Sequence, residues 1–414
     1  MAEKTDDYLE TACTIGATLC RDALWAGERC NWLGSSMEFV ENSWNVVHRV
    51  FGPDLYSGTS GIGLFLSHLY SYTPERTFRL TAEGALRQAV SRLEDLAPSR
   101  IGFYVGCTGV AYALISMGEL LGLNESIDAG FALLSDLAND EQPLSWDVLS
   151  GSAGALPVWL KLHRRYSKKF LLGLAVRHGD MLLAAAEQSD VGWSWDTLHL
   201  HGQTNLTGFS HGTAGISWAL LELYSVTGER RFRTGAEEGF RYERHYFSRE
   251  LENWPDFRNF SLTRDPSDKP GYLTAWCHGA PGIGLSRLRA YELLRDETCR
   301  TEAEAALRTT AHALKTALTS GVGNYSLCHG NAGNAELLLY ANQVLGLTEH
   351  NAVLAEVADV GVRQHHFGEY PWPCGVTDGG QTPNLMLGLA GIAYFYLRMH
   401  DPQRTPSLLI VCPS

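Results

Sequence analysis

The chain has no excess of positive charge, which argues against two large classes of partner. Its 414 residues include 33 lysines and arginines against 46 aspartates and glutamates, which gives a formal net charge of −13. Proteins that bind the phosphate backbone of nucleic acids, or an anionic membrane surface, present clustered basic residues. We therefore expect neither nucleic acid nor a membrane surface to be the main partner.

The sequence also lacks the signs of export. The segment Met1–Asp7 has neither the basic nor the apolar region of a signal peptide. No apolar run approaches the roughly 20 residues that a membrane-spanning helix needs. The nine cysteines are scattered, odd in number and without a Cys-x-x-Cys pair, so they do not indicate a disulfide framework. We expect a soluble, cytoplasmic protein in a reducing compartment.

Several catalytic signatures are missing as well. Glycine pairs are frequent, but none ends in Gly-Lys-Ser/Thr or follows a predicted strand, which argues against nucleotide binding. The chain contains no His-Glu-x-x-His zinc motif. No pair of carboxylates stands out for glycoside hydrolysis, although that chemistry is not excluded.

What the sequence does contain is a repeated turn. A Gly-x-x-Gly element occurs seven times along the chain. The seven pairs are Gly58–Gly61, Gly106–Gly109, Gly151–Gly154, Gly212–Gly215, Gly279–Gly282, Gly330–Gly333 and Gly388–Gly391. Self-similarity of this kind indicates an array of supersecondary units.

The residues around each turn predict helices of two kinds. The run after the second glycine is apolar nearly all round, as in a buried helix, whereas the segments before the turns are amphipathic. We therefore predict an all-α fold, an α/α toroid of about seven helical hairpins with inner and outer helix layers. Residues 1–414 would form a single domain, with an irregular insertion near residues 238–276 that could form a loop over the site.

Two of the turns carry the same unusual pair of side chains. Cys277-His278 precedes Gly279, and Cys328-His329 precedes Gly330. Thiolates and imidazoles at equivalent places in successive repeats indicate zinc, so we predict that Cys277, Cys328 and His329 bind Zn²⁺. Three protein ligands would leave one position open, as in catalytic sites. The alternative is two buried cysteines that pack near turns.

Two further residues are candidates for proton transfer. His211 takes the place of His278 and His329 in its own repeat, and a neutral imidazole near zinc could act as general acid or base. Asp147 lies just upstream of the third turn and could orient a histidine or simply cap a helix. His278 itself could be a metal ligand, a neighbour of a ligand or a structural residue.

These motifs, in this order within seven repeats, resemble the lanthionine synthetase C-like family. The likeness spans essentially the whole chain, and the two Cys-His-Gly motifs are its specific part. The resemblance implies an α/α toroid with zinc held by Cys277, Cys328 and His329, with His211 as proton donor or acceptor and Asp147 near the metal. Nisin-type cyclases often carry tyrosine and arginine where this chain has His278 and Leu273. The Trp-Cys-His-Gly form is closer to two-domain synthetases and eukaryotic relatives.

The resemblance also implies a chemistry. Bacterial members add a cysteine thiol of a peptide to dehydroalanine or dehydrobutyrine, which forms a thioether ring, and eukaryotic members add glutathione to dehydroamino acids in damaged proteins. We predict a zinc-dependent lanthipeptide cyclase that acts on a dehydrated precursor peptide. We expect no dehydratase domain before the motifs, so we expect a separate dehydratase as a possible partner. The alternatives are glutathione addition and a non-catalytic, zinc-containing peptide-binding module.

Overall fold

The computed structural model describes residues 2–40, 43–96, 101–138, 145–199, 204–258 and 269–413. Its contacts divide the chain into two compact units. Unit 1 comprises Met1–Pro143, Ala317–Gly333 and Ala352–Leu409, and unit 2 comprises Leu144–Thr316, Asn334–Asn351 and Ile410–Ser414. The organisation of residues 1–414 as a single domain stays a prediction. Among the described residues, no helix is long and apolar enough to cross a membrane.

Each of the seven glycine turns leads into a helix that is buried on nearly every side. In α2, for example, every residue from Thr59 to Leu69 is buried. These inner helices are α2 (Thr59–Tyr72), α4 (Cys107–Leu121), α6 (Ser152–Tyr166), α8 (Thr213–Thr227), α10 (Ala280–Leu294), α12 (Asn331–Leu345) and α14 (Leu389–His400). The apolar runs that follow the glycines explain this burial, because an apolar helix surface is stable only away from water.

The outer helices bury one face only. In α3 the buried side chains include Phe78, Ala82, Ala85 and Ala89, which recur at helical spacing, with charged residues between them. The outer helices are α1 (Ala2–Arg21), α3 (Arg76–Val90), α5 (Asn124–Leu137), α7 (Lys169–Ala184), α9 (Arg230–Tyr246), α11 (Glu297–Ser320) and α13 (Asn351–Gly361). A short 3₁₀ helix (Leu93–Asp95) and a π-helical turn (Val362–His366) complete the helical elements of the described residues.

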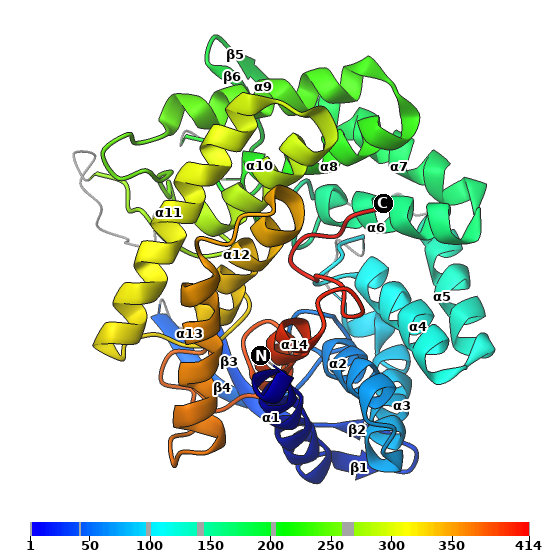
Figure 1. Cartoon of the computed structure of the whole chain (residues 1–414). Helices are drawn as coiled ribbons and strands as arrows, with labels where there is room; N and C mark the ends of the chain where they lie inside the picture. The colour runs from blue at the N-terminus through cyan, green and yellow to red at the C-terminus, as the bar shows by residue number, and fades with distance from the viewer. Residues whose placement is uncertain are drawn as a thin grey trace. The chain divides into compact units, whose positions relative to one another are not determined.

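The hairpins run in the opposite order to the one that the repeats suggest. The amphipathic segments before the turns favour an outer helix followed by its inner partner. Instead, the inner helices α2, α4, α6 and α8 pack on the outer helices that follow them, α3, α5, α7 and α9 (Figure 1). Gly122 and Gly228 end inner helices in the left-handed conformation and turn the chain back within two residues. The first helix, α1, is left to pair with the last, α14.

Backbone hydrogen bonds join neighbouring turns within unit 1. The N–H of Cys328 donates to the carbonyl of Met386 (3.0 Å), and the N–H of Met386 donates to the carbonyl of Tyr56 (2.9 Å). The N–H of Tyr56 donates in turn to the carbonyl of Tyr104 (2.8 Å). The sixth, seventh, first and second turns therefore lie in that order, and the last repeat of the chain neighbours its first.

The second glycine of each turn is needed for close backbone approach. A Cβ at Gly109 would overlap the carbonyl oxygen of Phe103 and lie 3.1 Å from Cβ of Leu55 in the neighbouring repeat. We therefore expect Gly109→Ala to lower the free energy of unfolding by about 1–3 kcal/mol, the usual cost of overpacking. Exposed Gly173 in α7 is the matched control, because its added Cβ would meet nothing within 4 Å. Gly173→Ala should raise stability by about 0.5–1 kcal/mol, and thermal unfolding of both variants compares the two shifts.

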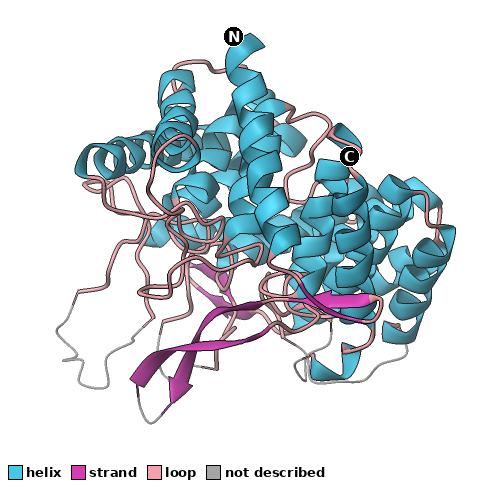
Figure 2. Ribbon diagram, turned by 90° about the horizontal axis from the view of Figure 1, so that it is seen from below, coloured by secondary structure: helices cyan, strands magenta, loops and turns pink. Residues whose placement is uncertain are grey.

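Three short β-hairpins, which the all-α prediction omits, interrupt the helical pattern. They are β1 (Leu24–Ala26) with β2 (Arg29–Asn31), β3 (Leu33–Val40) with β4 (Ser43–Val50), and β5 (Glu187–Ser189) with β6 (Gly192–Ser194). The β3–β4 hairpin is the longest and extends away from the helices of its unit (Figure 2).

The irregular insertion expected near residues 238–276 begins later than predicted. Helix α9 continues to Tyr246, because buried residues at helical spacing hold it against its neighbours as far as Glu243. The described part beyond it contains only isolated bridges, between Ser248 and Asn253, between Asp256 and Gly271, and between Thr274 and Gly279. Residues 259–268 lie outside the described residues, so a loop over the site stays a prediction.

Candidate functional site

Asp147 and His211 form a close pair within unit 2. Oδ2 of Asp147 lies 2.5 Å from Nδ1 of His211, and the two side chains are 2% and 22% exposed. The other oxygen, Oδ1, accepts hydrogen bonds from the backbone N–H (2.7 Å) and the hydroxyl (2.9 Å) of Ser150. One oxygen of Asp147 therefore braces the third turn and the other contacts His211, while α6 has Gly151 at its N-cap and, among the described residues, no side-chain cap.

Backbone bonds hold the His211 segment between two other repeats. The N–H of Val148 donates to the carbonyl of Ser210 (3.0 Å), and the N–H of Ser210 donates to the carbonyl of Cys277 (3.0 Å). Residues 208–212 match a Gly-x-Ser-x-Gly pattern, but Ser210 is fully buried and its hydroxyl also donates to Cys277. The third, fourth and fifth turns are thus adjacent, and they bring Asp147, His211 and Cys277 into one region of unit 2.

His278 is a buried ring beside His211. It is 1% exposed, its ring centroid lies 6.0 Å from that of His211, and neither ring nitrogen has a hydrogen-bond partner among the residues that the structure describes. Nδ1 is 3.9 Å from Oδ1 of Asp256, which is too long for a hydrogen bond. Burial lowers the pKa of His278 to about 3, with Arg258 acting in the same direction and Asp256 against it.

The other Cys-His pair lies in unit 1. Cys328 is 5% exposed, and its N–H is bonded to the carbonyl of Met386. His329 is exposed, and its Nε2 lies 2.9 Å from the carbonyl oxygen of Gly375. A Cβ at Gly375 would come within 3.0 Å of that ring nitrogen, so glycine permits the close approach. The carbonyl of Gly375 fixes the orientation of the imidazole.

The predicted zinc ligands therefore fall in different units. Cys277 belongs to unit 2, whereas Cys328 and His329 belong to unit 1. Within either unit, the described residues hold no group of three or more histidine, cysteine, aspartate or glutamate side chains that could bind a metal ion. The zinc set stays a prediction, while the contact between Asp147 and His211 is part of the structure.

Two residues that contact His211 and His329 could not be predicted from the sequence. Thr197 donates its hydroxyl hydrogen to the carbonyl oxygen of His211, and Gly375 accepts from His329. Thr197 follows the Trp193–Trp195 stretch, and Gly375 lies outside the seven turns. His199 has a left-handed backbone (φ 54°), and His201 lies outside the described residues. No spacing rule connects any of these positions to a turn.

The comparison with known families agrees with the motifs. Residues 49–410 match the family model described as lanthionine synthetase C-like protein. The match covers most of the chain, including all seven turns, so the protein belongs to this family.

Three relatives show what kinds of protein the chain is similar to. The lacticin 481/lactococcin biosynthesis protein LcnDR2 of Lactococcus lactis subsp. lactis is 23% identical over 389 residues, which cover 89% of this chain and 38% of LcnDR2. The nisin biosynthesis protein NisC of the same organism is 23% identical, with 73% and 77% coverage. Glutathione S-transferase LANCL1 of Danio rerio is 24% identical, with 84% and 82% coverage. The chain thus spans well under half the length of LcnDR2.

Solved structures confirm the fold class. Nisin cyclase aligns with a TM-score of 0.65 at 17% identity, and the alignment covers 85% of this chain and 89% of that one. A GH76 α-mannanase of Bacteroides thetaiotaomicron aligns with a TM-score of 0.50 at 12% identity and 96% coverage of both chains. Such low identities carry no conclusion about activity. The structural alignments confirm the predicted fold class, an all-α toroid of paired helices.

Proposed function

We propose that the protein is a zinc-dependent lanthipeptide cyclase. It would add the thiol of a peptide cysteine to dehydroalanine or dehydrobutyrine and so form lanthionine or methyllanthionine. The observation that carries the proposal is the Asp147–His211 pair, which presents an oriented imidazole beside the turn that bears Cys277. Membership of the lanthionine synthetase C-like family and the similarity to NisC support the same reaction.

The donor set suits zinc in its chemistry. Cys277 and Cys328 would supply two thiolates, and His329 would supply one imidazole nitrogen, the ligand types that zinc prefers. In a neutral imidazole, the bond from Nε2 to the carbonyl of Gly375 leaves Nδ1 with the lone pair for a metal. Histidine ligands commonly donate their second N–H to a carbonyl in this way. When bound, zinc would provide a fourth position at which a substrate thiol is held and ionised.

The chain's own residues would manage the proton. As the sulfur bonds to the β-carbon, the carbon–carbon double bond opens and the α-carbon takes up a proton. His211 is the proposed donor through Nε2, because its Nδ1 faces Asp147. The negative carboxylate would hold the ring in one orientation and stabilise its protonated form. The proton that the thiol loses balances the one that the α-carbon gains, so no other reactant is needed.

Asp147→Asn tests this orienting role. The amide oxygen can still accept from Ser150, but the charge opposite His211 is lost. We expect kcat for thiol addition to fall roughly 10- to 100-fold, the usual cost of removing a partner that orients a histidine. Zinc content and KM should not change. Unaltered kcat in a folded Asp147→Asn protein would remove Asp147 from the mechanism.

Glutathione addition is the second candidate, and the similarity to LANCL1 favours it. The same residues would serve, because only the source of the thiol differs. The thiol would come from a separate small molecule, whereas the cyclase uses a cysteine of the acceptor peptide itself. The dehydroamino acid could then lie in any accessible peptide or protein.

One experiment separates the candidates. Purified protein, with its metal content measured, is mixed with a dehydroalanine peptide that carries a free cysteine, and a second sample receives a cysteine-free peptide with glutathione. A ring does not change the mass, so unreacted thiols are alkylated before mass spectrometry. A thiol that resists alkylation only in the presence of the enzyme supports the cyclase, and a glutathione adduct supports the alternative. Dehydrated precursor peptides are tested in the same way. If the protein contains zinc but forms no product with any of these substrates, the remaining candidate is a peptide-binding module.

A further inference from the structure

A buried carboxylate on an outer helix braces the segment that carries His211. Glu243 lies on α9 and is fully buried. Its Oε1 accepts two backbone hydrogen bonds, from the N–H of Gly208 and from the N–H of Ala214, both at 2.9 Å. These residues lie three positions before and three positions after His211. A single oxygen thus fixes both ends of the segment.

Three other turns of the chain are braced by a nearby residue. Asp54 accepts from the N–H of Ser57 (2.7 Å), Asp147 from Ser150 (2.7 Å) and Asn384 from Leu387 (3.0 Å). Each acceptor lies four residues before the first glycine of its turn, a place that Gly208 takes in the His211 repeat.

A side chain at that place would not fit in the His211 repeat. Gly208 has a φ of 108°, and a Cβ there would come within 2.9 Å of Nδ1 of His278. The brace that these three turns carry locally is supplied here from α9 by Glu243.

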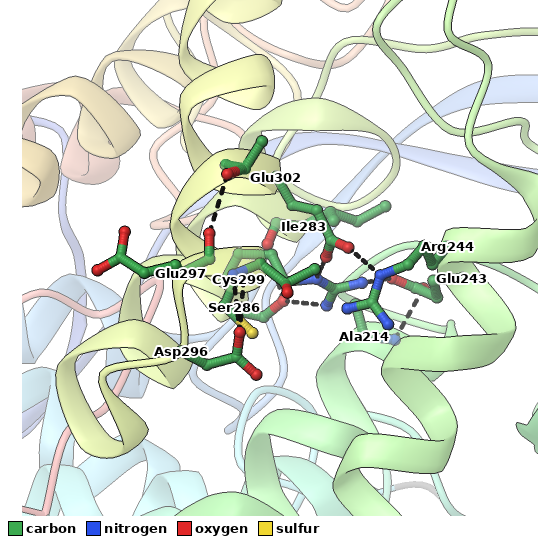
Figure 3. A network of polar contacts seen from close by, with 12 residues as sticks. Ala214, Glu243, Arg244, Ile283, Ser286, Asp296, Glu297, Cys299 and Glu302 are labelled. Atoms are coloured by element: carbon green, nitrogen blue, oxygen red, sulfur yellow. Dashed lines mark hydrogen bonds and ion pairs between the residues drawn. The ribbon is translucent and has the colours of Figure 1, made fainter.

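An ion network holds Glu243 in place. Its Oε2 pairs with Nη2 of Arg287 on α10 (3.2 Å), and both side chains are 0% exposed. Nε of Arg287 pairs with Glu302 on α11 (2.6 Å), which also pairs with Arg244. The Arg287 guanidinium lies 4.1 Å from the ring centre of Phe240. Figure 3 shows this network reaching from α11 to the start of α8 at Ala214.

Burying these charges is costly, and apolar side chains of similar size often stabilise a protein more. Burial raises the pKa of Glu243 to about 7, while Arg287 and the two N–H groups act to lower it. A neutral brace such as Asn253, whose Oδ1 accepts from the N–H of Ala280 (2.9 Å), serves the next turn without a charge. The charged network at the His211 turn calls for a role beyond simple capping.

We infer that Glu243 is a positioning residue for His211. Through Gly208 and Ala214 it sets the path of the backbone, so that the imidazole meets Asp147 at hydrogen-bond distance. Glu243 touches neither substrate nor metal in this role. The inference rests on the proposed function of His211 in catalysis, but its structural part can be tested without any turnover.

Glu243→Gln is the informative change. An amide has one acceptor and one donor, so its NH₂ must face either the two N–H groups or Arg287, which are all donors. The segment should therefore shift. We expect kcat to fall about tenfold to a hundredfold, the size of effect that a misplacement of about 1 Å can have. KM and zinc content should stay unchanged. In a His211→Ala background, Glu243→Gln should cause no further loss of kcat.

The readout that does not depend on activity is the His211 ring. In protein labelled with ¹⁵N-histidine, the resonance of the proton between His211 and Asp147 should shift or vanish in Glu243→Gln. Glu222→Gln is the matched control, because Glu222 on α8 is also fully buried and pairs with Arg289 (2.5 Å), away from this segment. It should leave the resonance and kcat unchanged. If Glu243→Gln does not fold, Glu243→Asp carries the test, because it keeps the charge but withdraws the oxygen by one methylene.

Two results would overturn the inference. One is an unchanged His211 resonance in folded Glu243→Gln, and the other is an equal loss of kcat with and without His211. Either would reduce Glu243 to a purely structural residue. If the wild-type protein forms no thioether with any thiol, the proposed function fails, and the resonance still decides whether Glu243 positions His211.

Discussion

Cys328→Ala is expected to remove nearly all the zinc from the purified protein, and Cys277→Ala should do the same. Each change deletes one of two proposed thiolate ligands. Even partners that only orient a ligand are worth about 10- to 100-fold in affinity, so loss of a thiolate should weaken zinc binding by more than about 100-fold. Metal content, measured by mass spectrometry after dialysis against a moderate chelator, checks this directly. Thiol addition should be lost with the metal.

Cys299→Ala provides the matched control for both variants. Cys299 lies on α11 and is 2% exposed, and burial raises the pKa of its thiol to about 12. A thiol that stays protonated is a poor ligand, so this variant should keep its zinc. Full zinc content in both Cys277→Ala and Cys328→Ala would defeat the ligand assignment. If only one of the two variants keeps its full zinc content, the cysteine changed in that variant is not a ligand and the other cysteine is.

The fold could be predicted from the sequence because its repeated element has a strict physical requirement. A helix that starts with its backbone against another carbonyl needs glycine, and Gly109 shows the overlap that any Cβ would cause. The order within each hairpin could not be predicted in this way. It depends on residues in the left-handed conformation at the ends of inner helices, such as Gly122 after α4 and Gly228 after α8. In the sequence these two glycines resemble many others. The β3–β4 hairpin was not predicted, because its valines fit a helical face as well as a strand.

The site was predictable only where its residues belong to the repeats. His211 was found because it precedes a turn glycine, as His278 and His329 do. The sequence could only suggest a contact between Asp147 and His211, because 64 positions separate them. Glu243 gave no signal, since it is one of several charged residues on an amphipathic helix and lies 29 positions from Ala214. Such contacts follow from tertiary packing, which composition and spacing do not encode.

His211→Ala should have the second large effect, this time on the chemistry and not on the metal. The change removes the proposed proton donor and leaves the three proposed zinc ligands intact. A positioned acid or base typically contributes about 10²- to 10⁴-fold, so kcat should fall within that range. Zinc content should stay close to wild type, because the ring is partly exposed and its main side-chain partner is Asp147. The same alkylation assay, run with a dehydroalanine peptide, measures the loss.

The pattern across three variants distinguishes the proton-transfer role from damage to the fold. His312→Ala, at an exposed position on α11, should match wild type and shows that losing a histidine has no general effect. The double variant Asp147→Asn/His211→Ala should be no slower than His211→Ala alone, because the carboxylate acts through the ring that is already missing. If kcat of the double variant is lower than that of His211→Ala, Asp147 has its own contact with the reacting groups. Full turnover by His211→Ala would assign proton delivery to another group, and Asp147 would then be left with the brace at Ser150 as its only role.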